Sequence, residues 1–212
     1  MIARRVTVPL LALLSVLSVL ALQLILVSAS IGFAKSGLAK ASDDLAVDNT
    51  WLQIAKALSF SNPDVFALEA RALRSSAIAS WDSQDVAQAY LQQSLLVWQK
   101  AISLRPEWPY YQLAAFDIEV FMNADAEIIQ QRFQQIITLA PSERGMDKGF
   151  LELALFSWPQ LLPTQKDWVV ARLAIVPRRT LKTLYRSAKT VGREQLLCTL
   201  LPWGKVKSFC LT

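Results

Sequence analysis

The chain has 212 residues, a formal net charge of +5 and no histidine, and only six of its residues are glycine. This length accommodates one core of ordinary size, which predicts a single compact domain after a terminal segment. The lack of histidine removes the commonest general base and the commonest neutral metal ligand. Alanine, leucine and glutamine are abundant, whereas long alternating runs of β-branched residues are scarce beyond the N-terminal region. The composition therefore predicts an all-α fold.

The N-terminus contains a long apolar run. No residue from position 6 to position 34 is ionisable, and this length exceeds the ~20 residues that a helix needs to cross the hydrocarbon layer of a membrane. We therefore predict that residues 1–34 form a cytoplasmic stub and a transmembrane anchor. Residues 35–212 are then expected to form a helical domain outside the cytoplasm.

The flanking charges predict how the anchor is oriented. Arg4 and Arg5 precede the apolar run, whereas the two lysines that follow it are offset by Asp43 and Asp44. Because positive charge concentrates at the cytoplasmic end of a membrane helix, this bias favours a cytoplasmic N-terminus. A cleaved signal peptide is the alternative, since small residues at positions 28–30 and 34 suit a peptidase, although its apolar region is usually only about 7–15 residues long.

Start and stop signals predict the later helices. A first helix is expected over residues 43–59, and Asn62 is expected to cap a second helix that begins at Pro63 and ends near Trp81. Further helix starts are expected at Asp82 or Ser83, at Pro109, at Asn123, at Ser142 and at Thr164, the last in a capping box with Asp167.

A short motif recurs at the spacing of a helical repeat. AISLRP ends at Pro106, IITLAP ends at Pro141, 35 residues later, and RLAIVP ends at Pro177, a further 36 residues along. Because one helix pair cannot bury its apolar face alone, this period predicts a solenoid of tetratricopeptide-like helical hairpins. In the first motif, Pro106 is expected to end one helix and Pro109 to begin the next.

Three aromatic residues, Trp108, Tyr110 and Tyr111, surround Pro109. The simpler interpretation is a packing wedge that sets the angle between consecutive helices. Contact with a partner or ligand is the alternative, because exposed aromatic rings are common where proteins bind. Both roles stay open at the level of the sequence.

Two cysteines, Cys198 and Cys210, lie close to the C-terminus with Pro202 and Gly204 between them. In an oxidising compartment they would form a disulfide that joins the C-terminal tail to the last helix. The alternative is a pair of buried free thiols in a cytosolic protein. The predicted position outside the cytoplasm favours the disulfide.

The charges are unevenly distributed. Residues 35–165 contain ten basic and fifteen acidic residues, whereas residues 166–212 contain ten basic and two acidic residues. We call four of the latter the basic stripe: Lys182, Arg186, Lys189 and Arg193. Their spacing of four, three and four predicts one helix face, which could contact anionic lipid headgroups, an anionic glycan or an acidic protein surface. A solvated face without a partner is the alternative, and a location outside the cytoplasm argues against nucleic acid.

Residues that carry catalytic chemistry are few. Two cysteines without histidine make no zinc site, and the common phosphate-binding and nucleophile motifs are missing from the sequence. Two carboxylate pairs, Asp117 with Glu119 and Asp125 with Glu127, are each two positions apart, so their members point to different faces of a helix. We interpret them as solvated helix surface. The sequence therefore predicts a non-enzymatic protein without a cofactor.

Several of these features resemble the VpsP-type polysaccharide biosynthesis proteins of Gram-negative bacteria. The resemblance covers residues 57–201, and a similar tetratricopeptide-like segment occurs in the tail of some O-antigen-ligase-like proteins. The matching residues are Ala101, Leu104, Arg105, Pro106, Trp108, Pro109 and Tyr110, then Leu139, Ala140, Pro141 and Glu143, then Trp158, Pro159 and Cys198.

The resemblance implies a location and a role. It implies a single-pass protein of the bacterial inner membrane with a periplasmic domain, which acts with protein partners in the assembly or export of an exopolysaccharide. A chaperone-like ancillary of the protein translocon is the alternative function, because a short N-terminal tail, one anchor and a periplasmic helical domain also suit that role.

Overall fold

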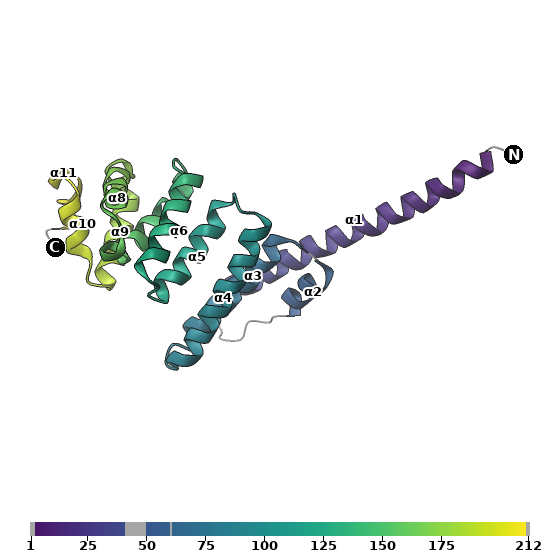
Figure 1. Ribbon diagram of the computed structural model, residues 1–212, viewed down its shortest axis with the longest axis horizontal. Helices are drawn as coiled ribbons and strands as arrows, with labels where there is room; N and C mark the ends of the chain where they lie inside the picture. The colour runs from purple at the N-terminus through teal and green to yellow at the C-terminus, as the bar shows by residue number, and fades with distance from the viewer. Residues whose placement is uncertain (1–2, 41–49, 60, 211–212) are drawn as a thin grey trace. The chain divides into compact units, whose positions relative to one another are not determined.

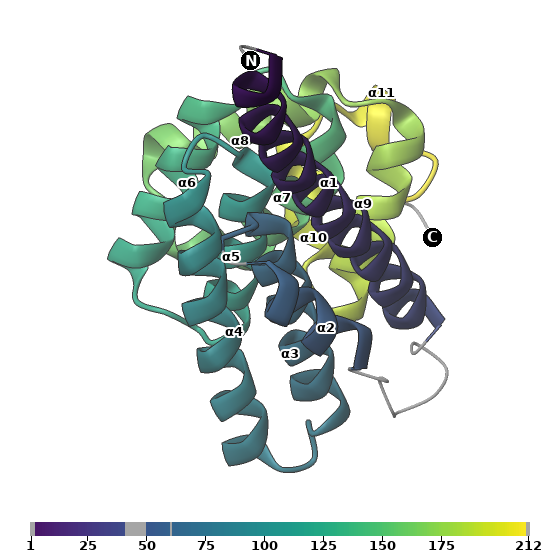
Figure 2. The same cartoon turned by 90° about the vertical axis from the view of Figure 1, so that its right-hand side faces the viewer.

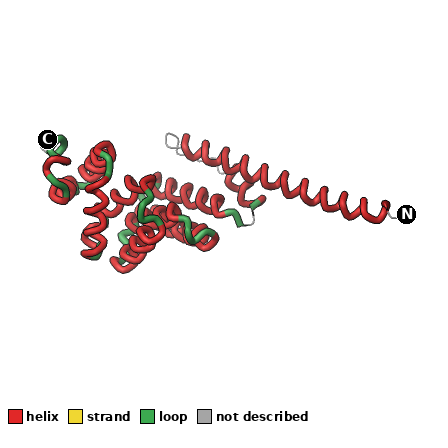
Figure 3. Tube along the Cα trace, turned by 90° about the horizontal axis from the view of Figure 1, so that it is seen from above, coloured by secondary structure: helices red, strands yellow, loops and turns green. Residues whose placement is uncertain are grey.

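The computed structural model describes residues 3–40, 50–59 and 61–210, and none of them forms a β-strand (Figure 3). The predicted all-α fold is confirmed. The chain divides into two compact units, Met1–Leu104 and Arg105–Thr212, which we call unit 1 and unit 2. The predicted domain boundary after residue 34 lies inside the first helix. This helix continues to Lys40, beyond the end of the uncharged run.

Unit 1 is built from α1 (Ala3–Lys40), α2 (Thr50–Leu58), α3 (Pro63–Ala79) and α4 (Gln84–Leu104). In Figure 1, α3 and α4 form a hairpin, while α2 lies against α1 and α3. Helix α2 occupies the second part of the helix that was predicted over residues 43–59. Asp43 and Asp44, on which the predicted orientation partly depends, lie outside the described residues.

Helix α1 is long and apolar enough to span a membrane over Leu13–Ala34. The side chains of residues 13–22 are exposed, as expected for a helix that faces lipid. Towards its C-terminal end the same helix enters the core of unit 1, because Val27, Ile31 and Ala34 are buried together with residues of α2 and α3. Helix α1 therefore combines a membrane-compatible half with a half that is part of a folded core.

The hairpin of unit 1 depends on small side chains. Ala70, Ala77 and Ala101 are fully buried, which lets α3 and α4 approach each other closely. At this contact the hydroxyl of Ser94 donates to the main-chain carbonyl of Ala70 at 2.8 Å. The buried ring of Trp98 fills the adjoining space. The hairpin is thus packed closely through small side chains.

Unit 2 follows α4. It consists of α5 (Pro109–Phe121), α6 (Ala126–Leu139), η1 (Arg144–Met146), α7 (Asp147–Phe156), η2 (Trp158–Gln160), α8 (Pro163–Ile175), α9 (Arg178–Thr190), α10 (Glu194–Leu200) and α11 (Trp203–Val206). Helix α5 contacts α6 and α7, α7 contacts α8 and α9, and α9 contacts α10 (Figures 1 and 2). The alternate helices α5, α7 and α9 therefore pack on one another, and α5 also packs on α6, the helix that follows it.

The three proline motifs mark helix ends. Helices α4, α6 and α8 end two residues before Pro106, Pro141 and Pro177 respectively, and α5 begins at Pro109 as predicted. Proline ends a helix because it lacks the N–H donor and its ring clashes with the preceding turn. Helix ends thus recur along the chain at the 35- and 36-residue spacings of the three motifs. The assembly of these helix pairs into a solenoid stays a prediction.

Two helix-start predictions near α3 and α5 have different outcomes. Asn62 caps α3 as predicted, since its Oδ1 accepts from the Asp64 N–H at 3.0 Å. Asn123 is not the cap of α6. It has a positive φ of 51° and ends α5, with the Ala124 N–H donating to the Glu119 carbonyl at 2.9 Å. Asparagine tolerates this left-handed conformation better than most residues, which explains why it terminates one helix rather than starting the next.

Two further cap predictions are wrong. Ser142 does not start a helix; the carboxylate of Glu143 instead accepts from the Gly145 N–H at 2.9 Å and caps η1. Thr164 does not cap α8, because the helix already begins at Pro163. The side chain of Gln165 accepts from the Leu162 N–H at 3.1 Å in its place.

An aromatic cluster forms the centre of unit 2. Its members are Phe116 from α5, Phe133 from α6, Phe150 from α7 and Trp168 from α8. The closest two ring centroids, those of Phe133 and Phe150, are 4.8 Å apart. The four positions follow each other at steps of 17, 17 and 18 residues. One helix with its linker takes about this length, so each helix contributes one ring to the same core.

Candidate functional site

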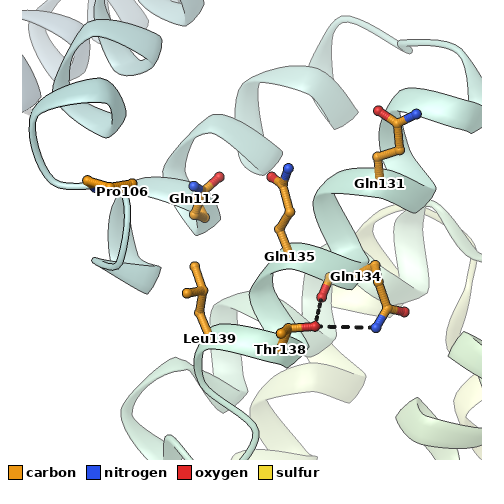
Figure 4. A pocket seen from close by; sticks show the side chains of 7 residues that line it. All are labelled: Pro106, Gln112, Gln131, Gln134, Gln135, Thr138 and Leu139. Atoms are coloured by element: carbon orange, nitrogen blue, oxygen red, sulfur yellow. Dashed lines mark hydrogen bonds between the residues drawn. The ribbon is translucent and has the colours of Figure 1, made fainter.

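An open cavity of about 570 Å³ lies beside α5 and α6 in unit 2 (Figure 4). Its lining residues are Pro106, Gln112, Gln131, Gln134, Gln135, Thr138 and Leu139. We call this cavity the amide groove, because four of the seven side chains are primary amides. None of the lining residues carries a charge. In this respect the amide groove differs from an acid–base active site.

Helix periodicity explains how these side chains come together. Gln131, Gln134, Gln135 and Thr138 lie on α6 at steps of three, one and three residues, so they share one face of that helix. The opposite face of α6 is apolar and enters the core through Ile129, Phe133 and Ile136. Gln112 is supplied by α5 and completes the groove from the neighbouring helix.

An ion pair between α5 and α6 lies next to the groove. The guanidinium of Arg132 bonds the carboxylate of Glu119 at two points, with Nη2 to Oε1 at 2.7 Å and Nε to Oε2 at 3.0 Å. Glu119 is only 2% exposed. This carboxylate was predicted to be solvated helix surface, and that prediction is wrong because α6 covers it with Arg132.

Arg132 also orients two of the groove amides. Its Nη1 donates to the Oε1 atoms of Gln112 and Gln135, the second at 3.3 Å. Because a guanidinium only donates, each amide must turn its oxygen towards Arg132. The Nε2 group of the exposed Gln135 can therefore donate to a ligand, whereas Gln112 is only 5% exposed.

The other two amides each use one N–H inside the protein. The Nε2 of Gln134 donates to the Thr138 hydroxyl at 3.4 Å, and the Nε2 of Gln131 donates to the Glu127 carboxylate at 3.2 Å. Their Oε1 atoms and the second N–H of each Nε2 group can still bond a ligand. The amide groove thus offers both donors and acceptors, with no net charge. This arrangement suits a neutral ligand that both donates and accepts hydrogen bonds.

The three aromatic residues that the sequence singled out lie outside the lining of the groove. Tyr111 is 3% exposed and is a packing residue, which contradicts its suggested contact with a partner. Trp108 is 42% exposed and lies under the guanidinium of Arg105, 5.6 Å from its ring centroid. Tyr110 is also exposed, and its hydroxyl donates to Glu143 at 3.2 Å. Trp108 and Tyr110 therefore keep exposed ring surface, as the alternative role requires.

Tyr110 has a perturbed acidity. Its pKa is raised above the ordinary value of 10.0, first by desolvation and then by the charge of Glu143 and the hydrogen bond to it. The two side chains close over Gly145, where an added Cβ would lie 2.6 Å from the Tyr110 hydroxyl and 2.8 Å from the Glu143 carboxylate. Glycine at position 145 thus allows this contact between α5 and the loop before η1.

The basic stripe is only partly a helix face. Lys182, Arg186 and Lys189 are exposed on α9, and the other side of that helix is buried through Leu181, Leu184 and Ala188, as predicted. Arg193 does not continue the stripe on α9, because the helix ends at Thr190 and Gly192 turns the chain with φ 68°. The stripe on this helix therefore consists of three cations.

Cys198 and Cys210 form a disulfide, with their Cα atoms 6.0 Å apart. It joins α10 to the segment that follows α11. Leu197, Val206 and Phe209 are buried in the core of unit 2 next to it. The disulfide therefore ties the last turn of the described chain to a core that is already packed.

Three further carboxylates of unit 2 lie at a helix start or bond a neighbouring side chain. Asp125 immediately precedes α6, and Glu127 accepts from Gln131. Asp147 is paired with Arg172 at 2.6 Å, which joins α7 to α8. Across the part of the chain that the structure describes, no group of three or more Cys, Asp or Glu residues is placed to hold a metal ion.

Sequence reasoning missed the amide groove. The signal was present as the glutamine-rich face of residues 131–138, but glutamine on a helix normally indicates only solvent exposure. The buried pair behind it was also missed, because Glu119 and Arg132 lie on different helices. Comparisons with protein families, with curated proteins and with solved structures give no match to this chain.

Proposed function

We propose that this protein is a membrane-anchored, non-enzymatic accessory of exopolysaccharide assembly or export, whose amide groove holds an uncharged stretch of the glycan. The observation that carries the proposal is the polarity of the groove. The exposed amides of Gln131, Gln134 and Gln135 present both donors and acceptors without charge, and Arg132 holds Gln112 and Gln135 by their oxygens.

Glycan chemistry fits this surface. Sugar hydroxyl groups both donate and accept, and acetamido groups do the same through their N–H and C=O. Pro106 and Leu139 add apolar surface at the edge, on which the C–H face of a sugar ring can pack. The lining supplies no free cation for a carboxylate or sulfate, so neutral sugar units are favoured over anionic ones.

The proposed location rests on three features. The uncharged run in α1 is long and apolar enough to cross a bilayer, Arg4 and Arg5 favour a cytoplasmic N-terminus, and the Cys198–Cys210 disulfide suits an oxidising compartment. The domain that follows the anchor would then act in the periplasm, with protein partners in the inner membrane. The exposed cations of α9 are available there to an anionic headgroup or an acidic partner surface.

Binding to defined oligosaccharides tests the proposal. The full chain, in nanodiscs, is titrated with neutral acetylated chitohexaose, with anionic hexagalacturonate and with reduced carboxymethylated α-lactalbumin as an unfolded chain. We expect chitohexaose to bind, Gln134→Leu and Gln135→Leu to weaken it at least fivefold, and Gln195→Leu, an exposed glutamine on α10, to leave it unchanged. A groove that binds only the unfolded chain would instead support the chaperone-like role, and one that binds none of the three would refute the proposal.

Deletion of the gene provides the cellular test. Loss of surface polysaccharide with normal protein secretion is expected. General envelope stress with normal polysaccharide would favour the translocon ancillary. Reintroduction of Gln134→Leu and of the matched Gln195→Leu then shows whether the phenotype depends on the amide groove.

A further inference from the structure

An exposed apolar face continues from α1 onto α2 in unit 1. We call it the interface face and define it by Phe33, Trp51 and Ile54, which are 54%, 41% and 36% exposed. The rings of Phe33 and Trp51 stack with centroids 4.9 Å apart. Trp51, Ile54 and Ala57 follow at steps of three along α2 and are all exposed, whereas Leu52 and Ala55 are buried against the unit.

The length of the uncharged run explains where this face lies. A helix over residues 6–34 is ~43 Å long at 1.5 Å per residue, whereas the hydrocarbon layer is about 30 Å thick. The helix is therefore longer than the hydrocarbon layer is thick by roughly nine residues. The C-terminal end of the run is the part that is covered by protein, since Val27, Ile31 and Ala34 are buried against α2 and α3. The excess thus lies at the level of the membrane–water interface.

Two contacts show that α2 runs back along α1 towards the membrane. Trp51, at the start of α2, lies on Phe33, while Leu58, at its end, is bound by Gln23. The Gln23 amide donates to the Leu58 carbonyl at 2.7 Å. Figure 2 shows α2 beside α1 over this stretch. This hydrogen bond pairs a polar side chain of the apolar run with a carbonyl that has no partner inside its own helix, as a poorly hydrated setting requires.

The one charged side chain of α2 is neutralised. Lys56, the basic residue of this helix, is paired with Glu69 of α3 at 2.6 Å. The interface face itself carries no ionisable side chain. A tryptophan beside aliphatic side chains on such a face is the composition that favours the headgroup level of a bilayer.

We propose that α2 stands against α1 in the outer interface of the membrane, with its C-terminal end towards the hydrocarbon layer and Trp51 and Ile54 facing the lipid, so that unit 1 is held on the bilayer surface by α2 as well as by α1. The occupant of the interface face is lipid because the face is continuous with the lipid-compatible surface of α1. It follows that the anchor is retained: cleavage at positions 28–34 would remove Val27 from the core of unit 1, and at the later positions Ile31 and Ala34 as well.

Depth-dependent quenching of tryptophan fluorescence tests the inference. The full chain is reconstituted in vesicles of POPC and POPG (3:1), with and without phosphatidylcholine brominated near the headgroup end of its acyl chains. We expect the bromine-quenched signal to fall clearly in Trp51→Phe. Trp81→Phe, which removes an exposed tryptophan beyond the end of α3, is expected to keep the quenched signal of the wild type.

A second pair of variants separates membrane contact from loss of structure. Ile54→Asp places a charge on the interface face and is expected to reduce quenching of Trp51 by brominated lipid, whereas Gln53→Asp, also exposed on α2, is expected to leave it unchanged. Helical circular dichroism checks that both fold. The inference is overturned if Trp51 is reached by aqueous acrylamide but not by brominated lipid, or if the intact mass of the mature protein shows that residues 1–28 have been removed.

Discussion

Arg132 and Glu119 face each other across α6 and α5 in unit 2, and two hydrogen bonds of 2.7 and 3.0 Å join the guanidinium to the carboxylate. The pair is buried, so each charge depends on the other for its solvation. Because Arg132 also holds Gln112 and Gln135, the packing of two helices and the polarity of the amide groove depend on one side chain.

Removal of one member of this pair is expected to be costly. Glu119→Leu leaves a buried guanidinium without its counter-ion and should lower the free energy of unfolding by ~3–5 kcal/mol. The double variant Glu119→Leu with Arg132→Leu should recover much of that loss, and Glu127→Ala, on the exposed face of α6, should change stability by about 0.5 kcal/mol or less. Urea denaturation of the full chain measures all three. Equal losses in the single and double variants would contradict the assigned coupling.

Tyr110 is expected to titrate above its ordinary pKa of 10.0. A raised pKa in the folded protein means that the phenol holds its proton more tightly than in the unfolded chain. Its contribution to stability is therefore complete below pH 10 and is lost as the pH rises through the folded value. Glu143→Gln removes the neighbouring charge and should lower the pKa. The phenolate absorbance near 295 nm, taken as the difference from Tyr110→Phe, measures it, and an unchanged pKa in Glu143→Gln would exclude the role of that carboxylate.

Two glycines in neighbouring elements are expected to respond in opposite directions to alanine. Gly149 lies inside α7, and an added Cβ there would make an ordinary contact of 3.7 Å with Leu113, so Gly149→Ala should stabilise unit 2 by about 0.5–1 kcal/mol. Gly145→Ala instead meets Tyr110 and Glu143 and should separate them. Thermal unfolding reports the first effect and the Tyr110 titration the second. A Gly145→Ala variant with the wild-type Tyr110 pKa would show that this contact does not need glycine.

The disulfide is expected to stabilise the C-terminal end of unit 2. It closes a short loop, with a sequence separation of 12, and the loss of such a crosslink costs ~3 kcal/mol in the chain-entropy account. Cys198→Ser and Cys210→Ser should therefore each lower the unfolding midpoint, and the double variant should match the single ones. Alkylation of the native protein without reductant, followed by mass measurement, checks the bond directly. Two alkylated cysteines in the native protein would contradict it.

The sequence predicted those features that depend on the local chain. The all-α fold, the cap at Asn62, the helix ends before Pro106, Pro141 and Pro177 and the membrane-compatible length of α1 all follow from properties of one residue and its immediate neighbours. Proline geometry, side-chain caps and uninterrupted hydrophobicity act within a turn or two of helix. Such features can therefore be predicted without knowledge of the tertiary contacts.

The errors and omissions share a different cause. Asn123 was assigned to the wrong helix because both a helix end and a helix start favour asparagine, and only the path of the chain distinguishes them. Glu119 was placed in solvent because its partner Arg132 belongs to another helix. Local patterns say which face of a helix is polar, but not what covers that face.

The chain by itself thus determined where helices begin and end, and that its N-terminal helix is able to span a membrane. The tertiary structure decided which polar side chains meet: Arg132 with Glu119 and two groove amides, Gln23 with Leu58, and Phe33 with Trp51. The physical reason is range. Helix propensity and capping act over a few residues, whereas burial, ion pairing and the polarity of an amide depend on side chains that are distant in the sequence and become neighbours only when the helices pack.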